Sequence, residues 1–224
     1  MTAGRPWLLV LDTATSRVVV AAGAPDGGLI AERTFPAEHR HGERLLATIE
    51  ELSDATALSL DDLRGIVVGT GPGAFTGLRV GLATAKTLAH ELGVPIVGVS
   101  TGEALLAAAA GATVLELPAG PNDRVEVRRG GPGRRIPGGT TTSREPGDVV
   151  VAVDLDGRSE PASAARGIAA LDGLAVALLG LGRARLAGQA DDPERLVPEY
   201  VSLPRGAGEG LDLEEGLAWS RDRR

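Results

Sequence analysis

The amino-acid sequence predicts an α/β protein with two lobes, the second of them divergent or reduced. Short apolar runs of strand length alternate with longer stretches whose apolar residues recur at helical spacing. The chain has 224 residues, enough for two lobes of about 100 residues each. Hydrophobic residues make up 43% and aromatic residues only 2%, so Val, Leu, Ile and Ala must form the core.

The first half of the chain has a regular order of elements. Three apolar strands separated by turn residues are predicted at 7–11, 18–22 and 29–35. Strands at 66–68 and 95–99 then alternate with helices at 43–52, 75–92 and 101–110, and Ser59 begins a short helical turn. The order β-β-β-α-β-α-β-α is that of an actin-like, ribonuclease H-like lobe, which we place at residues 1–111.

The second half, residues 112–224, gives a weaker pattern and is assigned to a carboxyl-terminal lobe. Strands are predicted at 114–117, 125–127, 149–153 and 174–179, and short helices at 162–170 and 181–187. A stretch near 130–142, rich in Gly, Pro, Thr and Arg, is expected to be an exposed loop. The two halves show no clear sequence repeat.

Composition and charge exclude several classes of protein. The chain has no cysteine, which excludes disulfides and a Cys nucleophile. No signal peptide or membrane span is apparent, so we expect a cytoplasmic protein without membrane contact. The net charge of −7 argues against a nucleic-acid binder that acts alone.

A glycine-rich segment at residues 69–81 lies between a strand and a helix and invites three interpretations. A P-loop is excluded because no Gly-Lys-Ser/Thr follows at the required spacing. A dinucleotide fingerprint would need an acidic residue after the next strand, where Ser100 and Thr101 stand instead, so an NAD-binding oxidoreductase is a weak alternative. The third interpretation is structural, a tight turn followed by a closely packed helix.

The helix that follows carries small residues every fourth position, which form one ridge. Such a ridge lets another helix approach closely, from the same lobe or from another chain. The ridge consists of Gly77, Gly81, Ala85 and Ala89. On the helix before it, the apolar residues are Leu45, Leu46, Ile49 and Leu52.

Several of these segments resemble the TsaB family. They are Leu-Asp-Thr-Ala-Thr at 11–15, His-Gly-Glu-Arg-Leu-Leu at 41–46, Gly-Pro-Gly-Ala-Phe-Thr-Gly-Leu-Arg-Val-Gly at 71–81 and Gly-Val-Ser-Thr at 98–101. The resemblance covers the first half of the chain. In the second half, Leu117 to Val127 departs from the Asp-Ala-Arg and Glu-Val-Tyr pattern of the family.

The resemblance implies two actin-like lobes and a scaffolding role without catalytic, cofactor or metal residues. TsaB proteins pair with TsaD, which transfers threonylcarbamoyl to N6 of the adenosine beside the anticodon in tRNAs that read codons starting with A; the ATPase TsaE joins them. First-lobe helices supply much of the TsaD contact. The expected interface residues are Leu45, Leu46, Ile49, Gly77, Gly81, Ala85 and Ala89. Without its partner the chain is expected to form a homodimer.

The residues themselves offer little for catalysis. The three histidines, at 39, 41 and 90, do not form a metal-binding pattern. Asp12 follows the first strand, where actin-like ATPases keep a carboxylate beside magnesium, but Ala14 stands where phosphate approach needs glycine. We expect Asp12 and Thr13 to form turn hydrogen bonds. The main alternative is an independent actin-like ATPase or sugar-kinase-like enzyme.

One local basic cluster contrasts with the acidic chain. It consists of Arg124, Arg128, Arg129, Arg134 and Arg135. The functional hypothesis is contact with the tRNA backbone inside the assembled complex. The alternative, which we favour, is a solvated hairpin and loop.

Overall fold

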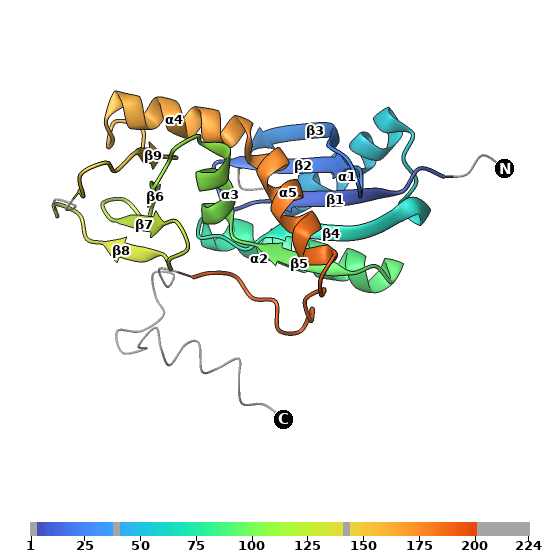
Figure 1. The fold of residues 1–224 in the computed structure, drawn as a ribbon. Coiled ribbons are helices and arrows are strands. Elements are labelled where there is room, and N and C mark those ends of the chain that lie inside the picture. Colours follow the sequence, from blue (N-terminus) through green and yellow to red (C-terminus); the bar gives the residue numbers. More distant parts are fainter. Residues whose placement is uncertain (1–3, 38–40, 141–143, 201–224) are drawn as a thin grey trace.

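The computed structural model describes residues 4–37, 41–140 and 144–200, with the backbone alone for 41–43. Two sheets lie side by side in an elongated molecule (Figure 1). The first has the strand order β3-β2-β1-β4-β5. Its strands are β1 (Trp7–Asp12), β2 (Arg17–Gly23), β3 (Leu29–Pro36), β4 (Leu63–Gly69) and β5 (Ile96–Val99).

The second sheet is smaller and has the order β8-β7-β6-β9. Its strands are β6 (Val114–Pro118), β7 (Arg124–Arg128), β8 (Arg134–Ile136) and β9 (Val150–Ala152). The pair β6–β7 is antiparallel and β6–β9 is parallel, as β1–β2 and β1–β4 are in the first sheet. The second sheet therefore repeats the first four strands of the first sheet in order and direction, and the structure describes no counterpart of β5.

The predicted fold class is confirmed, and the first lobe follows the predicted order. Its helices are α1 (His41–Thr56), the short 3₁₀ turn at Leu60–Asp62, α2 (Phe75–Leu92) and α3 (Thr101–Ala108). Ser59 caps the 3₁₀ turn by accepting a hydrogen bond from the Asp61 amide, as predicted. Helix α2 ends before Gly93, whose φ of 63° is left-handed and therefore favours glycine.

One prediction in the second half is wrong. Residues 174–179 form the first half of helix α5 (Leu174–Leu186), not a strand; α4 (Pro161–Asp172) precedes it. Leu174, Ala175, Leu178 and Leu179 are buried, at the spacing of one helix face. A short apolar run cannot distinguish a buried strand from a buried helix. Strand β8 also lies within the predicted exposed loop, of which residues 141 and 142 lie outside the described residues.

The two faces of the first sheet are covered by different helices. Helices α1 and α2 pack on one face, and α5 crosses the other, although α5 comes last in the chain (Figure 1). All six residues of β1 are buried, as expected for a central strand covered on both sides. On the α5 side one apolar cluster continues from Val10 and Val67 through Leu105 and Leu178 to Leu115 in the second sheet. The two lobes therefore share a core.

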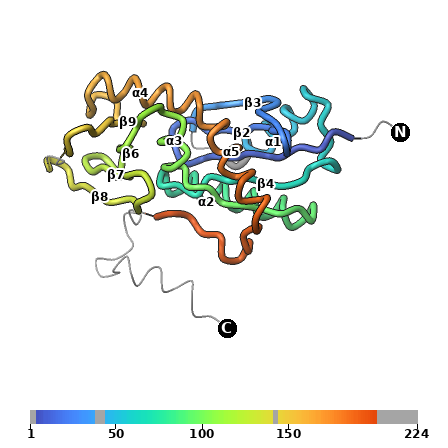
Figure 2. The backbone as a smooth tube through the Cα atoms, in the orientation of Figure 1, coloured from blue at the N-terminus to red at the C-terminus, as the bar shows by residue number. Residues whose placement is uncertain are grey.

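After α5 the chain runs along the β5 edge of the first sheet (Figure 2). We call residues 187–200 the strap. In the part of the chain that the structure describes, no single helix is long and apolar enough to cross a membrane. Helices α4 and α5 reach the length and apolar character of a membrane span only when taken together across a bend of 57°. Core helices of globular proteins can have the same length and composition.

Candidate functional site

The turn between β1 and β2 faces a cleft of about 690 Å³ between the lobes. This turn holds Asp12, the residue that the sequence places where actin-like ATPases keep a carboxylate. Asp12 is fully buried, and its two carboxylate oxygens accept hydrogen bonds from the Ala14 amide (2.9 Å) and the Thr101 hydroxyl (2.6 Å). The turn hydrogen bond predicted for Asp12 is therefore present.

Burial raises the pKa of Asp12 to about 6, although the hydrogen bonds from Thr101 and Ala14 oppose the rise. The Thr101 hydroxyl also accepts a hydrogen bond from the Gly71 amide at 3.1 Å. A side chain at Gly69 would overlap the Asp12 carboxylate. The carboxylate is thus enclosed by the glycine-rich segment and the start of α3.

The glycine-rich segment lies directly on the β1–β2 turn. The Ala74 amide donates to the Ala14 carbonyl at 2.7 Å, and a Cβ at Gly73 would overlap that same carbonyl group. The structural interpretation of the segment is therefore the one that the geometry supports. The backbone of Gly73 and Ala74 therefore occupies the space directly against the Ala14 carbonyl.

The small-residue ridge of α2 also faces this turn. A Cβ at Gly77 would overlap the Thr13 carbonyl, and one at Gly81 would overlap the Thr13 hydroxyl. That hydroxyl donates to the Gly77 carbonyl at 2.7 Å, a contact with α2 instead of the predicted turn hydrogen bond. Ala85 and Ala89 belong to the apolar core on the same side of the sheet.

The predicted interface residues consequently fall into two groups. Gly77, Gly81, Ala85 and Ala89 pack inside their own lobe, because the ridge fits the end of β1. Leu45 and Ile49, on the inner side of α1, are also buried. These six residues are buried and not accessible to a partner in this structure; of the predicted interface residues only Leu46, 53% exposed, faces outward.

The five arginines of the predicted basic cluster lie on or next to the second sheet. Each forms a hydrogen bond within the chain. They bond as follows: Arg124 to Glu116, Arg128 to Asp148 and Glu126, Arg129 to the carbonyls of Leu106 and Ala112, Arg134 to Glu126, and Arg135 to Asp123. Glu116 and Glu126 stand opposite each other on β6 and β7 and are only 2% and 3% exposed. Buried carboxylates need such cations, so the structure favours an intramolecular role for the cluster.

The tRNA-contact hypothesis requires that changing Arg134 and Arg135 to glutamine weakens tRNA binding by a complex that contains this chain; from the intramolecular pairs we expect no change. An arginine that binds a phosphate contributes about one unit to the slope of log affinity against log salt. The measurement is filter binding at several salt concentrations, with Arg64→Gln in the first lobe as control. A slope lower by about two units in the double variant would restore the tRNA-contact hypothesis.

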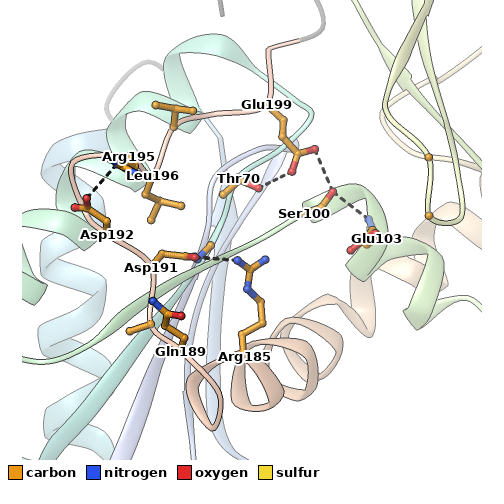
Figure 3. A pocket seen from close by; sticks show the side chains of 15 residues that line it. Thr70, Ser100, Glu103, Arg185, Gln189, Asp191, Asp192, Arg195, Leu196 and Glu199 are labelled. Atoms are coloured by element: carbon orange, nitrogen blue, oxygen red, sulfur yellow. Dashed lines mark hydrogen bonds and ion pairs between the residues drawn. The ribbon is translucent and has the colours of Figure 1, made fainter. Parts of the chain in front are cut away.

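A groove of about 680 Å³ lies between the strap, the carboxyl ends of β4 and β5, and the second lobe (Figure 3). Glu199 of the strap accepts hydrogen bonds from the hydroxyls of Thr70 (2.7 Å) and Ser100 (3.2 Å). Desolvation raises the pKa of Glu199, and these two bonds oppose the rise. Asp191 is held by Arg185 at 2.9 Å. Sequence patterns do not reveal this groove, because its residues come from four distant segments.

Of the three histidines, the structure describes the side chain of His90, which lines neither the cleft nor the groove. His90 is exposed on α2, and His39 and the side chain of His41 lie outside the described residues. The predicted absence of a metal pattern around them stays a prediction.

The first half of the chain matches two related groups of proteins: a tRNA N6-adenosine threonylcarbamoyltransferase of Geotalea uraniireducens, 40% identical over 93 residues (42% of this chain and 26% of that protein), and the TsaB proteins. Residues 20–122 match the model of the family described as "TsaD: tRNA N6-adenosine threonylcarbamoyltransferase". The chain is 33% identical over 94 residues to the tRNA threonylcarbamoyladenosine biosynthesis protein TsaB of Escherichia coli, which covers 42% of this chain and 40% of that protein. It is 36% identical over 100 residues to TsaB of Bacillus subtilis, covering 45% and 43%. The resemblance to the TsaB family is confirmed.

A solved structure extends the similarity in fold to the second lobe. An uncharacterized Pseudomonas aeruginosa protein, described as similar to the peptidase YeaZ, superposes with a TM-score of 0.67 over 88% of this chain and 100% of that one. Its sequence is 24% identical, so this likeness shows the fold alone. The sequence matches span less than half the length of the curated TsaB relatives.

Proposed function

We propose that this chain is a non-catalytic scaffolding subunit that pairs with a TsaD-like subunit in threonylcarbamoylation of tRNA. A TsaE-like ATPase and tRNA would join the same complex, which implies a cytoplasmic location. The similarity of the first lobe to TsaB proteins supports the proposal. One observation supports the proposal that the subunit is non-catalytic. Around the β1–β2 turn, Asp12 is buried and the backbone of Gly73 and Ala74 lies against Ala14.

The alternative of an independent actin-like ATPase or sugar-kinase-like enzyme is not favoured. Such an enzyme needs a carboxylate that reaches a hydrated magnesium ion and a turn that phosphate oxygens can approach. In this chain the carboxylate bonds to Thr101 and Ala14 instead.

The outward sides of α1 and α2 are the surface that we propose for the partner, and we call them the partner face. The two helices lie next to each other on one side of the first sheet. Leu46 of α1 and Ala83 of α2 are exposed, and Val80 and Leu88 are half-buried. Covering an exposed apolar side chain such as Leu46 with a partner removes apolar surface from water and so contributes to the binding free energy. The homodimer expected without a partner would use the same surface.

We expect Leu46→Asp to abolish co-elution with the TsaD-like subunit, because it places a carboxylate in an apolar contact. Val176→Asp is the matched control: it makes the same kind of change at a residue of similar exposure (57%) on α5, on the opposite side of the first sheet. Both changes are at exposed positions and should leave the fold intact.

The measurement is co-expression with the TsaD-like subunit of the same organism, followed by size-exclusion chromatography. Equal loss in both variants would refute the partner face. A wild-type chain that does not co-elute would refute the proposed function.

A further inference from the structure

Beyond residue 188, hydrogen bonds from the rest of the described chain hold the strap at two of its residues, Asp191 and Glu199. At one end the Asp191 amide donates to the Ile96 carbonyl at 2.9 Å, and the Asp191 carboxylate accepts from the Gly98 amide at 2.8 Å. At the other end the Glu199 amide donates to the Thr70 carbonyl at 2.7 Å. Residues 187–190 are exposed. A segment with so few anchors can open without unfolding the lobe.

One buried apolar side chain of the strap packs against the first sheet. Leu196 is only 9% exposed and lies against Gly98 and Thr70; a Cβ at Gly98 would overlap it. Its neighbour Arg195 points away from this seat toward Asp192 (Figure 3) and has a side chain that is 88% exposed. The strap therefore covers the free edge of β5 with one buried leucine and a few hydrogen bonds.

The end of the strap contacts the start of α2. The ring of Tyr200 lies 4.9 Å from that of Phe75, the first residue of α2, and the Arg79 guanidinium lies 5.0 Å from the Phe75 ring. Helix α2 has no side-chain cap at Ala74, so its first turn lacks the usual local support. The Glu199 carbonyl also passes close to Gly71 in the loop before the helix.

We propose that docking of the strap is coupled to binding at the partner face through the first turn of α2. The docked strap contacts Phe75 and the loop before it, and its coupling acts on the first turn of α2, ahead of the point where Gly77 packs on Thr13 and the helix leads on to Val80 and Ala83. This coupling rests on the proposed function, because it takes the TsaD-like subunit as the occupant of the partner face. Coupling between two sites is reciprocal, so partner binding must also stabilise the docked strap.

The test uses the full chain, alone and with the TsaD-like subunit, and combines hydrogen exchange with binding affinity. In Leu196→Ala and in Tyr200→Ala, we expect the amides of Asp191 and Glu199 to exchange about ten times faster. The partner affinity should fall about five-fold or more in both variants, which is the lower range of measured couplings. Arg195→Ala should change neither quantity. Addition of the partner to the wild-type chain should slow exchange at Glu199.

If Leu196→Ala proves unstable, Tyr200→Ala still tests the coupling, because Tyr200 is 36% exposed and lies outside the core. Faster strap exchange with unchanged partner affinity would overturn the coupling and leave the proposed function standing. Strap exchange that the partner does not slow would overturn it as well. A wild-type chain that fails to bind the partner would overturn both proposals.

Discussion

Replacing Gly81 by arginine is expected to destabilise the isolated chain strongly, which makes this variant unsuitable for mapping an interface. The Cβ alone would overlap the Thr13 hydroxyl, and the rest of the side chain would extend into the packing between α2 and the end of β1. Overpacking and burial of an unpaired guanidinium together should cost about 4 kcal/mol or more of the free energy of unfolding. That is a large part of the roughly 5–15 kcal/mol by which domains are usually stable.

The matched control is Ala83→Arg, two residues further along the same helix. Ala83 is exposed, and arginine is a good helix former, so the free energy of unfolding should change by less than about 0.5 kcal/mol. Urea denaturation of both variants measures the difference. If Gly81→Arg were as stable as Ala83→Arg, the ridge would not pack on Thr13 as the structure describes.

The order of elements in the first lobe could be predicted because each has a strong local signal. Residues 75–92 show helical spacing between a glycine-rich turn and Gly93, and the strands before α1 are separated by turn residues. The first half of helix α5 could not be identified, because a short apolar run such as residues 174–179 fits a buried helix and a buried strand equally well. The repeat of the first sheet in the second is a property of strand order and has no trace in the residues.

The candidate site was harder to predict because it depends on which faces meet. Spacing correctly identified the ridge of α2, but it could not show that Thr13 of the neighbouring turn fills it. The arginines were recognisable as a basic cluster, yet two of their partners, Glu116 and Asp148, come from other segments of the chain. Local sequence thus identifies the residues that are special, and only tertiary contacts decide whether they face a partner or their own core.

Replacing Asp12 by asparagine is expected to remove an unusual pH dependence of stability. The folded-state pKa of Asp12 is raised from 3.8 to about 6, so between these values the folded chain holds a proton that the unfolded chain has released. The free energy of unfolding must therefore fall as pH rises from about 4 to 6. At about 1.36 kcal/mol per pKa unit, the loss from this one group is about 3 kcal/mol above pH 6.

Asparagine has nearly the same shape, its carbonyl can accept from the Ala14 amide, and it carries no charge to bury. The Asp12→Asn variant should therefore be more stable than the wild type at pH 7 by about 1–3 kcal/mol, with little difference at pH 4. Glu32 and Glu199, whose pKa values are also raised, remain in both proteins and cancel in the comparison. Urea denaturation at pH 4, 5, 6 and 7 measures this difference. Parallel pH profiles for the two proteins would mean that burial does not raise the pKa of the Asp12 carboxylate, because the hydrogen bonds from Thr101 and Ala14 offset it.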